Sequence, residues 1–318
     1  MSDFADLAPA AAEAFALGDV VAPMRVAARG EQARIWRLDT ESGSFAVKQP
    51  WRGFAPRTDG QDVAFQEAVR AQTDVLMPVP VRRPGGAYVA MVGGHPVRVS
   101  TWMDLRPPDV GLDPRGVGEL LAALHRVDFT ASGGVDPWYW APVGEPAWLT
   151  CADRLAAAGA PFAETFRAAV PRLLELEELL EPPGETRICH CDLWADNLLE
   201  TTGGGLCVID WDNCGPADPG HELAMLVYEF GQGSAERMRA LSDAYVAAGG
   251  PGRLRRPSQL TMVIAQFGHF WAMAADAWLD PEATTAERHH AEHRIAELMS
   301  PPLTAPAVER IVAAVTDR

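Results

Sequence analysis

Three oxygen-bearing side chains surround two short apolar runs late in the chain. Asp192 and Asn197 precede the run 198–200, and Asp210 follows the run 206–208. A Gly-rich stretch separates the two runs, and this pattern predicts a hairpin. If the runs pair, Asn197 and Asp210 emerge at the same open end, and Asp192 lies on the loop that enters it. Carboxylate and amide oxygens are the hard ligands that Mg²⁺ prefers, and Mg²⁺ sites leave room for phosphate oxygens.

The segments that must position these side chains fall into two parts. Before residue 103 the chain has strand-like patterns, a helix-prone Ala-rich start and one stretch of helical apolar spacing at 62–72. The expected strands are 25–28, 33–38, 45–48, 79–82, 88–92 and 96–103. After Pro107-Pro108 helical patterns dominate, at 113–125, 148–180, 235–248, 259–279 and 283–298. We therefore expect a smaller strand-rich lobe, 1–103, and a larger helical lobe, 104–318.

Composition narrows the class of protein. The 318 residues are 48% hydrophobic and 22% charged, which is typical of a globular chain with two domains or lobes. The net charge of −16 argues against nucleic acid as a partner, because phosphate backbones need clustered Lys and Arg. No apolar run is long enough for a membrane span, and the five cysteines suggest no disulfide framework. We expect a cytoplasmic monomer or homodimer without membrane attachment.

Three linked motifs within residues 190–224 resemble one family. His190-Cys191-Asp192 followed by Asn197 is similar to the H-G-D-x-x-x-x-N loop of the aminoglycoside phosphotransferase and choline kinase superfamily. Ile-Asp-Trp-Asp at 209–212 resembles that family's I-D-W-[ED] metal motif. Gly-Pro-Ala-Asp-Pro-Gly-His-Glu-Leu-Ala at 215–224 resembles its G-x-x-D-P-x-x-D-L-A segment. The resemblance implies an α+β, two-lobed, protein-kinase-like fold, with an N-terminal antiparallel sheet and one helix, and a mainly helical C-terminal lobe.

The same resemblance implies roles for the three polar residues. Asp192 would be the catalytic residue, because it would accept or orient the proton of the substrate hydroxyl. Asn197 and Asp210 would hold Mg²⁺, and ATP would be the phosphoryl donor, with GTP as the alternative nucleotide. Phosphoryl transfer of this type relies mainly on positioning and charge neutralisation.

A kinase-like interpretation also requires a nucleotide site in the first hundred residues. Lys48, at the end of Phe-Ala-Val-Lys, resembles the strand lysine that holds the α- and β-phosphates, and Glu67 on the expected helix would orient it. Gly30 lies in the turn 29–33 that would cover the phosphates. The segment 99–103, with Ser100 and Trp102, would be the hinge whose backbone contacts adenine.

The acceptor is less sharply defined by the sequence. Trp194 and Asp196 lie on the catalytic loop, and Glu229 lies on a later segment, so these three are candidate substrate contacts. Tryptophan and carboxylates suit a cationic ligand, although most tryptophans pack in cores. Our first choice is a small-molecule kinase acting on an aminoglycoside or another amine-bearing antibiotic, which implies antibiotic resistance. The alternatives are a metabolite kinase for an amino sugar, a choline-like alcohol or homoserine, and a nucleotide-binding pseudokinase.

Several residues near the motifs have simpler interpretations. His190 is expected to brace the loop, and Asp218 and Glu222 are expected to brace a loop or cap a helix. The spacing of Cys189-His190-Cys191 does not favour structural zinc, because C-x-C is not a usual zinc spacing and the sequence has no C-x₂-C partner. A protein kinase is disfavoured, since the sequence lacks D-F-G and A-P-E and leaves no room for an activation loop after Asp210.

Overall fold

A computed structural model describes residues 4–30, 32–51, 60–300 and 302–317. The chain divides into two compact units. Unit 1 comprises residues 1–109, 127–129 and 196–214, and unit 2 comprises residues 110–126, 130–195 and 215–318. The expected lobe boundary at 103/104 therefore lies close to the first division, but the sequence did not indicate that residues 196–214 group with the N-terminal part.

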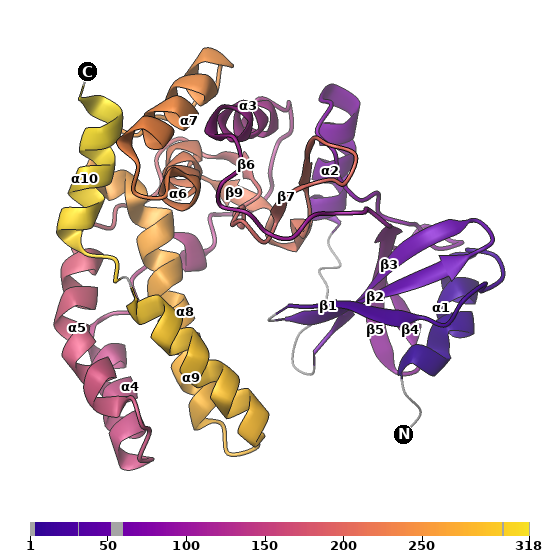
Figure 1. The fold of residues 1–318 in the computed structure, drawn as a ribbon, viewed down its shortest axis with the longest axis horizontal. Coiled ribbons are helices and arrows are strands. Elements are labelled where there is room, and N and C mark those ends of the chain that lie inside the picture. The colour runs from indigo at the N-terminus through magenta and orange to yellow at the C-terminus, as the bar shows by residue number, and fades with distance from the viewer. Residues whose placement is uncertain (1–3, 31, 52–59, 301, 318) are drawn as a thin grey trace. The chain divides into compact units, whose positions relative to one another are not determined.

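Unit 1 contains a five-stranded antiparallel sheet in the order β1-β2-β3-β5-β4 (Figure 1). The strands are β1 (Arg25–Arg29), β2 (Ala33–Thr40), β3 (Gly43–Pro50), β4 (Ala90–Val92) and β5 (His95–Thr101). In β3, Phe45 and Val47 are buried on one face. Successive side chains of a strand point to opposite faces, so Lys48 lies on the other face from these two.

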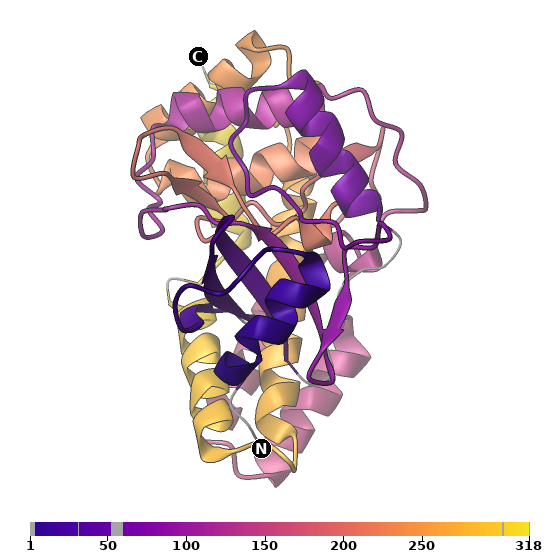
Figure 2. The same cartoon turned by 90° about the vertical axis from the view of Figure 1, so that its right-hand side faces the viewer.

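One face of this sheet is covered by helix α1 (Ala8–Phe15), which the indigo helix in Figure 2 shows. Its buried alanines and Phe15 pack in one cluster with Trp36, Leu38 and Val97 of the strands. The Pro at its start and the left-handed Ala16 at its end set its short length. The helix-prone Ala-rich start forms α1 and the predicted helical stretch forms α2 (Gln61–Gln72), so this part of the chain has one α-helix more than the kinase-like resemblance implied.

The predicted hairpin is present in unit 1 as β7 (Leu198–Glu200) and β8 (Leu206–Val208), paired antiparallel with Leu198 opposite Val208. Isolated bridges from Leu76 to Cys207 and from Leu105 to Thr201 attach it to earlier segments of the same unit. These pairings explain why the hairpin belongs to unit 1, although residues 102–197 separate it from the sheet in sequence.

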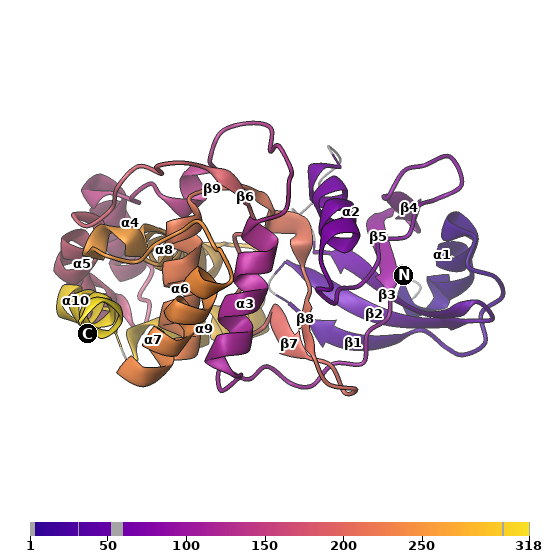
Figure 3. The ribbon, with the colours of Figure 1, turned by 90° about the horizontal axis from the view of Figure 1, so that it is seen from above.

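Unit 2 is mainly helical. Helices α3, α6 and α7 pack together (Figure 3), and buried side chains of α4, α5, α8 and α9 form a second cluster. A short antiparallel pair, β6 (Arg187–Cys189) and β9 (Gly215–Ala217), completes the unit. The helices are α3 (Pro114–His125), α4 (Glu145–Ala157), α5 (Ala163–Glu177), α6 (Pro219–Gly231), α7 (Ala235–Ala247), α8 (Thr261–Leu279), α9 (Thr285–Met299) and α10 (Ala305–Thr316).

Two expected elements differ in the structure, and helix α6 was not expected. The expected strand 79–82 forms one isolated bridge, from Pro80 to Ser100, beside which the Val81 N–H donates to the Val99 carbonyl and the Thr101 N–H donates to the Val79 carbonyl. The expected helix 148–180 is two helices, separated where Gly159 adopts a positive φ. Helix α6 was missed, because its Pro and Gly residues in the 215–224 motif favour a loop. Among the helices of the described residues, none combines the length and the apolar run that crossing a membrane requires.

Candidate active site

The open end of the β7–β8 hairpin brings Asn197 and Asp210 together, as its pairing predicts. The Ile209 N–H donates to the Asn197 carbonyl at 3.0 Å, which continues the ladder one step beyond the strands. Asp210 then takes a left-handed conformation, with φ 56°, which an aspartate tolerates better than most residues. The chain therefore turns sharply at this carboxylate, and the amide and carboxylate oxygens of the two residues form a hard donor set that fits Mg²⁺.

Lys48 contacts the carboxylate that the hairpin presents. Its Nζ lies 2.6 Å from Asp210 Oδ1 and 2.9 Å from Asp212 Oδ2. Burial by itself would lower the pKa of Lys48, but the two carboxylates outweigh it and raise the pKa above the ordinary value. The side chain therefore stays charged and is shared between two acids rather than fixed by one.

A second cation, Arg98 of β5, completes this group. Its guanidinium donates to Asp212 at 2.8 Å and forms an ion pair with Asp62, the second residue of α2. Burial would raise the pKa of Asp212, but Lys48 and Arg98 together lower it. We call these five residues, Lys48, Arg98, Asp62, Asp210 and Asp212, the lysine network, and all of them lie in unit 1.

The expectation that Glu67 orients Lys48 is not met. Glu67 accepts from Arg82 at 2.9 Å and from the Tyr88 hydroxyl at 2.8 Å. These two hydrogen bonds are the main cause of its lowered pKa. Asp62 lies five residues earlier, which is about 140° around a helix of 3.6 residues per turn. Asp62 therefore lies on the buried face of α2, whereas Glu67 lies on a half-exposed face beside Arg82.

The other predicted nucleotide contacts lie along the sheet. Ser100 stands opposite Ala46 in the β3–β5 pair. The Trp102 N–H donates to the Ser44 carbonyl at 3.0 Å, and its indole donates to Asp104 at 2.8 Å, so this backbone N–H is committed to the sheet. Gly30 donates to the Ala33 carbonyl at 2.9 Å and closes the turn between β1 and β2. Glu31 of that turn lies outside the described residues.

The loop that carries Asp192 is held by hydrogen bonds to its backbone. The Cys191 N–H donates to Glu222 Oε1 at 2.5 Å, and the Cys191 carbonyl accepts from Gln266 at 2.8 Å. Cys191 has φ 67°, in the left-handed region that favours glycine. Both peptide groups that flank Cys191 are thus fixed, and Asp192 follows directly with its side chain half-buried.

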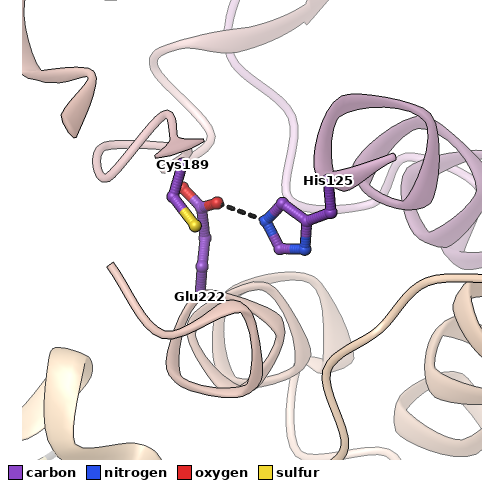
Figure 4. A group of neighbouring side chains, drawn as sticks. All are labelled: His125, Cys189 and Glu222. Carbon is purple, nitrogen blue, oxygen red and sulfur yellow. Dashed lines mark hydrogen bonds and ion pairs between the residues drawn. The ribbon is translucent and has the colours of Figure 1, made fainter. Parts of the chain in front are cut away.

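Glu222 belongs to a buried chain of hydrogen bonds. Its Oε2 lies 2.6 Å from His125 Nε2, which Figure 4 shows. His125 Nδ1 in turn lies 2.8 Å from the Tyr245 hydroxyl. Tyr245 accepts from the Gly252 N–H at 2.8 Å, so its own proton can go to His125 Nδ1. Burial alone would raise the pKa of Glu222, but the His125 hydrogen bond and the neighbouring charges lower it. We call Glu222, His125 and Tyr245, with the Cys191 N–H, the glutamate network.

His125, Cys189 and Glu222 have ligand atoms within 4.8 Å of one another, which raises the question of a metal. The 2.6 Å between His125 and Glu222 is a hydrogen-bond length. Two ligands of a tetrahedral zinc ion stand roughly 3.3 Å apart or more. Burial also raises the pKa of the Cys189 thiol well above its ordinary value, which disfavours a thiolate ligand. This cluster is therefore a structural brace, as expected for Glu222.

The predicted substrate residues have mixed surroundings. Glu229 accepts from the Ala195 N–H at 3.2 Å, which holds the loop, and the Trp194 indole donates to Gln266 at 3.0 Å. The Trp194 ring lies among partly exposed aromatic side chains, and Asp196 is exposed. We call this group the aromatic wall: Trp194, Tyr228, Phe267, Phe270 and Trp138, which stacks on His269 at 4.8 Å. A separate cavity of about 380 Å³ between α4 and α8 is not lined by Trp194, Asp196 or Glu229.

Solved structures of three small-molecule kinases have a fold similar to that of this chain. A spectinomycin phosphotransferase in complex with ADP and spectinomycin superposes with a TM-score of 0.68 at 12% identity, over 93% of this chain and 94% of that one. The choline kinase LicA from Streptococcus pneumoniae gives 0.59 at 13% identity, over 95% and 100%. An amicoumacin kinase in complex with AMP-PNP and Ca²⁺ gives 0.58 at 14% identity, over 94% of each chain. At these identities the likeness establishes the fold.

Sequence comparison defines the family. No curated protein sequence matches the chain. The model of the phosphotransferase enzyme family matches residues 24–257, which include the whole sheet, the catalytic loop and the hairpin. Because the match spans well over half of the 318 residues and contains both charged networks, the chain belongs to the phosphotransferase enzyme family.

Proposed function

We propose that this phosphotransferase transfers the γ-phosphoryl group of ATP to a hydroxyl of an amine-bearing small molecule, with Mg²⁺ as the metal. The observation that carries the proposal is the ion pair of Lys48 with Asp210, at the same hairpin end as Asn197. A strand lysine and a carboxylate–amide metal site are the parts that phosphoryl transfer from a Mg²⁺-nucleotide requires.

The roles follow from the charge of each group. Lys48 would bind the α- and β-phosphates, and Asn197 and Asp210 would hold Mg²⁺, which neutralises phosphate charge when bound. Asp192, on the braced loop, would accept or orient the proton of the acceptor hydroxyl. Fixing the backbone on both sides of Cys191 supports this role, because a displacement of about 1 Å can cost a hundredfold in rate.

The acceptor class is inferred from the aromatic wall beside the catalytic loop. Aromatic faces attract cations, and the effect grows when the cation is desolvated. Trp194, two residues after Asp192, lies in contact with Tyr228 and Phe267. An aminoglycoside or another amine-bearing antibiotic is the first candidate, and such an acceptor would make the enzyme a resistance factor. The same aromatic faces favour a choline-like alcohol as the second candidate.

An ATP-consumption screen tests the proposal. The purified protein would be assayed with Mg²⁺ against aminoglycosides, cyclic peptide antibiotics, macrolides, amino sugars, choline and homoserine. We expect turnover with at least one amine-bearing acceptor, and we expect Asp192→Ala to abolish it. If nucleotide binds but no member of the panel is phosphorylated, the pseudokinase alternative gains support. Phosphorylation of an acceptor without an amine would contradict the proposed acceptor class.

A further inference from the structure

Two cations face each other across the strand pair β3–β5. Lys48 and Arg98 are direct partners in the antiparallel register, and both lie on the face opposite the buried side chains of their strands. Like charges directly opposite each other are destabilising in a sheet. This pair is stable only because carboxylates surround it, and the arrangement of those carboxylates indicates what each cation does.

The carboxylates divide unequally between the two cations. Lys48 contacts Asp210 and Asp212, whereas Arg98 contacts Asp212 and Asp62. Asp62 is fully buried, and the Arg98 side chain is only 12% exposed. Lys48 and Asp210 are more accessible, at 23% and 38%. One end of the network is therefore fixed inside unit 1, and the other end is open.

Phosphate binding requires a change of partner at the open end. Lys48 has to leave Asp210 for the nucleotide, and Asp210 has to be free for the metal. Asp212 would oppose this step, because its negative charge also attracts Lys48. Arg98 satisfies Asp212 from the other side with a charge-assisted hydrogen bond. Its ion pair with the buried Asp62 keeps the guanidinium in that position.

We propose that Arg98, anchored by Asp62, is a positioning residue of the nucleotide site, which holds Asp212 so that Lys48 and Asp210 can engage a Mg²⁺-nucleotide. The inference rests on the proposed function. It also assigns to Asp62 the connection between helix α2 and the site that the sequence assigned to Glu67. Arg98 acts through Asp212 and does not itself contact the reacting atoms.

The test compares nucleotide binding in several variants of the full chain. Isothermal titration calorimetry would measure the Kd of Mg·AMP-PNP and of adenosine, which lacks phosphates. Arg98→Gln is expected to raise the Kd of Mg·AMP-PNP by about tenfold or more, as the loss of a charged hydrogen bond predicts. Adenosine affinity is expected to stay unchanged. Arg98→Lys keeps the charge and is expected to retain part of the affinity.

Matched variants separate positioning from folding. Arg25→Gln removes an exposed cation that pairs with Asp39 in the same sheet and is expected to leave both Kd values unchanged. Arg98→Gln alone leaves Asp62 buried without this partner and can lower Tm. The double variant Asp62→Asn/Arg98→Gln removes both charges and is expected to regain Tm while the Kd of Mg·AMP-PNP stays raised.

Four outcomes would overturn the inference. The first is wild-type affinity for Mg·AMP-PNP in folded Arg98→Gln. The second is equal weakening of adenosine and Mg·AMP-PNP, which would indicate a merely structural role. The third is recovery of affinity together with Tm in the double variant. The fourth is a raised Kd of Mg·AMP-PNP in Glu67→Gln together with an unchanged Kd of Mg·AMP-PNP in Asp62→Asn. If the wild-type protein binds no Mg·AMP-PNP at all, the proposed function fails as well, and this result is distinct from the other four.

Discussion

The two charged networks of this protein are built differently. In the lysine network of unit 1, Lys48, Asp210 and Asp212 retain 23%, 38% and 28% exposure of their side chains. In the glutamate network of unit 2, the side chains of His125 and Glu222 are fully buried. Groups that exchange partners with a ligand need access to solvent, whereas groups that fix a backbone are best satisfied inside. The difference predicts which carboxylates serve chemistry and which serve the fold.

The largest expected effect falls on the residue that the glutamate network positions. Asp192→Ala should lower kcat by about 10²- to 10⁴-fold, as the loss of a general base does. Nucleotide affinity should change little, because Lys48 and Asp210 remain intact. Single-turnover kinetics with an identified acceptor and a separate nucleotide titration would measure the two effects. Near-normal turnover would contradict the role given to Asp192.

The next largest effect is a difference in stability between a variant of the glutamate network and a variant of the lysine network. Glu222→Ala leaves His125 and the Cys191 N–H without their buried acceptor, and the loss should be about 3–5 kcal/mol of unfolding free energy. Asp212→Ala removes a more exposed carboxylate and should cost clearly less, about 1–2 kcal/mol. Urea unfolding of the two variants measures both values. Equal losses would mean that the two networks do not differ as described.

The pH dependence of the unfolding free energy tests the glutamate network further. The folded pKa of Glu222 lies below the ordinary value. The unfolded chain therefore binds more protons, and this stabilisation is complete above about pH 4.3 and is lost as the pH falls through the folded pKa. Glu222→Gln should be less stable at neutral pH but should show a shallower slope between about pH 5 and pH 3. Urea unfolding across this range would measure the two slopes. If the unfolding free energies of the wild type and Glu222→Gln change in parallel with pH, the pKa of Glu222 is not lowered.

The smallest expected effect concerns Cys191, whose backbone has a left-handed conformation. Cys191→Gly relieves a left-handed conformation, worth about 1 kcal/mol, but removes a buried thiol of similar value. The unfolding free energy should stay within about 1 kcal/mol of wild type, with activity retained. Chemical denaturation and a rate assay would check both. A tenfold loss of activity would indicate that the thiol takes part in the chemistry.

Sequence reasoning succeeded where the signal was local. The hairpin could be predicted because two apolar runs flank a Gly-rich turn, and its pairing fixed the neighbourhood of Asn197 and Asp210. The strand that ends in Phe-Ala-Val-Lys was also predicted, and in the structure Lys48 lies on its face away from the core. The braces at Asp218 and Glu222 followed from their motif, and Asp218 does cap α6 by accepting from the Gly220 N–H.

The errors have physical causes. Glu67 was chosen by its distance in sequence from Lys48, but the phase of helix α2 gives the buried face to Asp62. That face could have been found from the spacing of Asp62 with Phe65 and Val69. Helix α6 is buried along most of its length, so it lacks the apolar stripe that marks a surface helix. The assignment of Glu229 to substrate stays a prediction, and the structure adds that this carboxylate accepts from the Ala195 N–H of the loop.

The central claim is that the lysine network binds a Mg²⁺-nucleotide. The most direct measurement is the change in Tm on adding Mg·ATP to the wild type, Asp192→Ala and Asp210→Ala. A ligand at a hundred times its Kd stabilises the folded state by about 2.7 kcal/mol. We expect a clear rise in Tm for the wild type and for Asp192→Ala, and a rise that is lost in Asp210→Ala. An equal rise in all three proteins, or none in the wild type, would contradict the account.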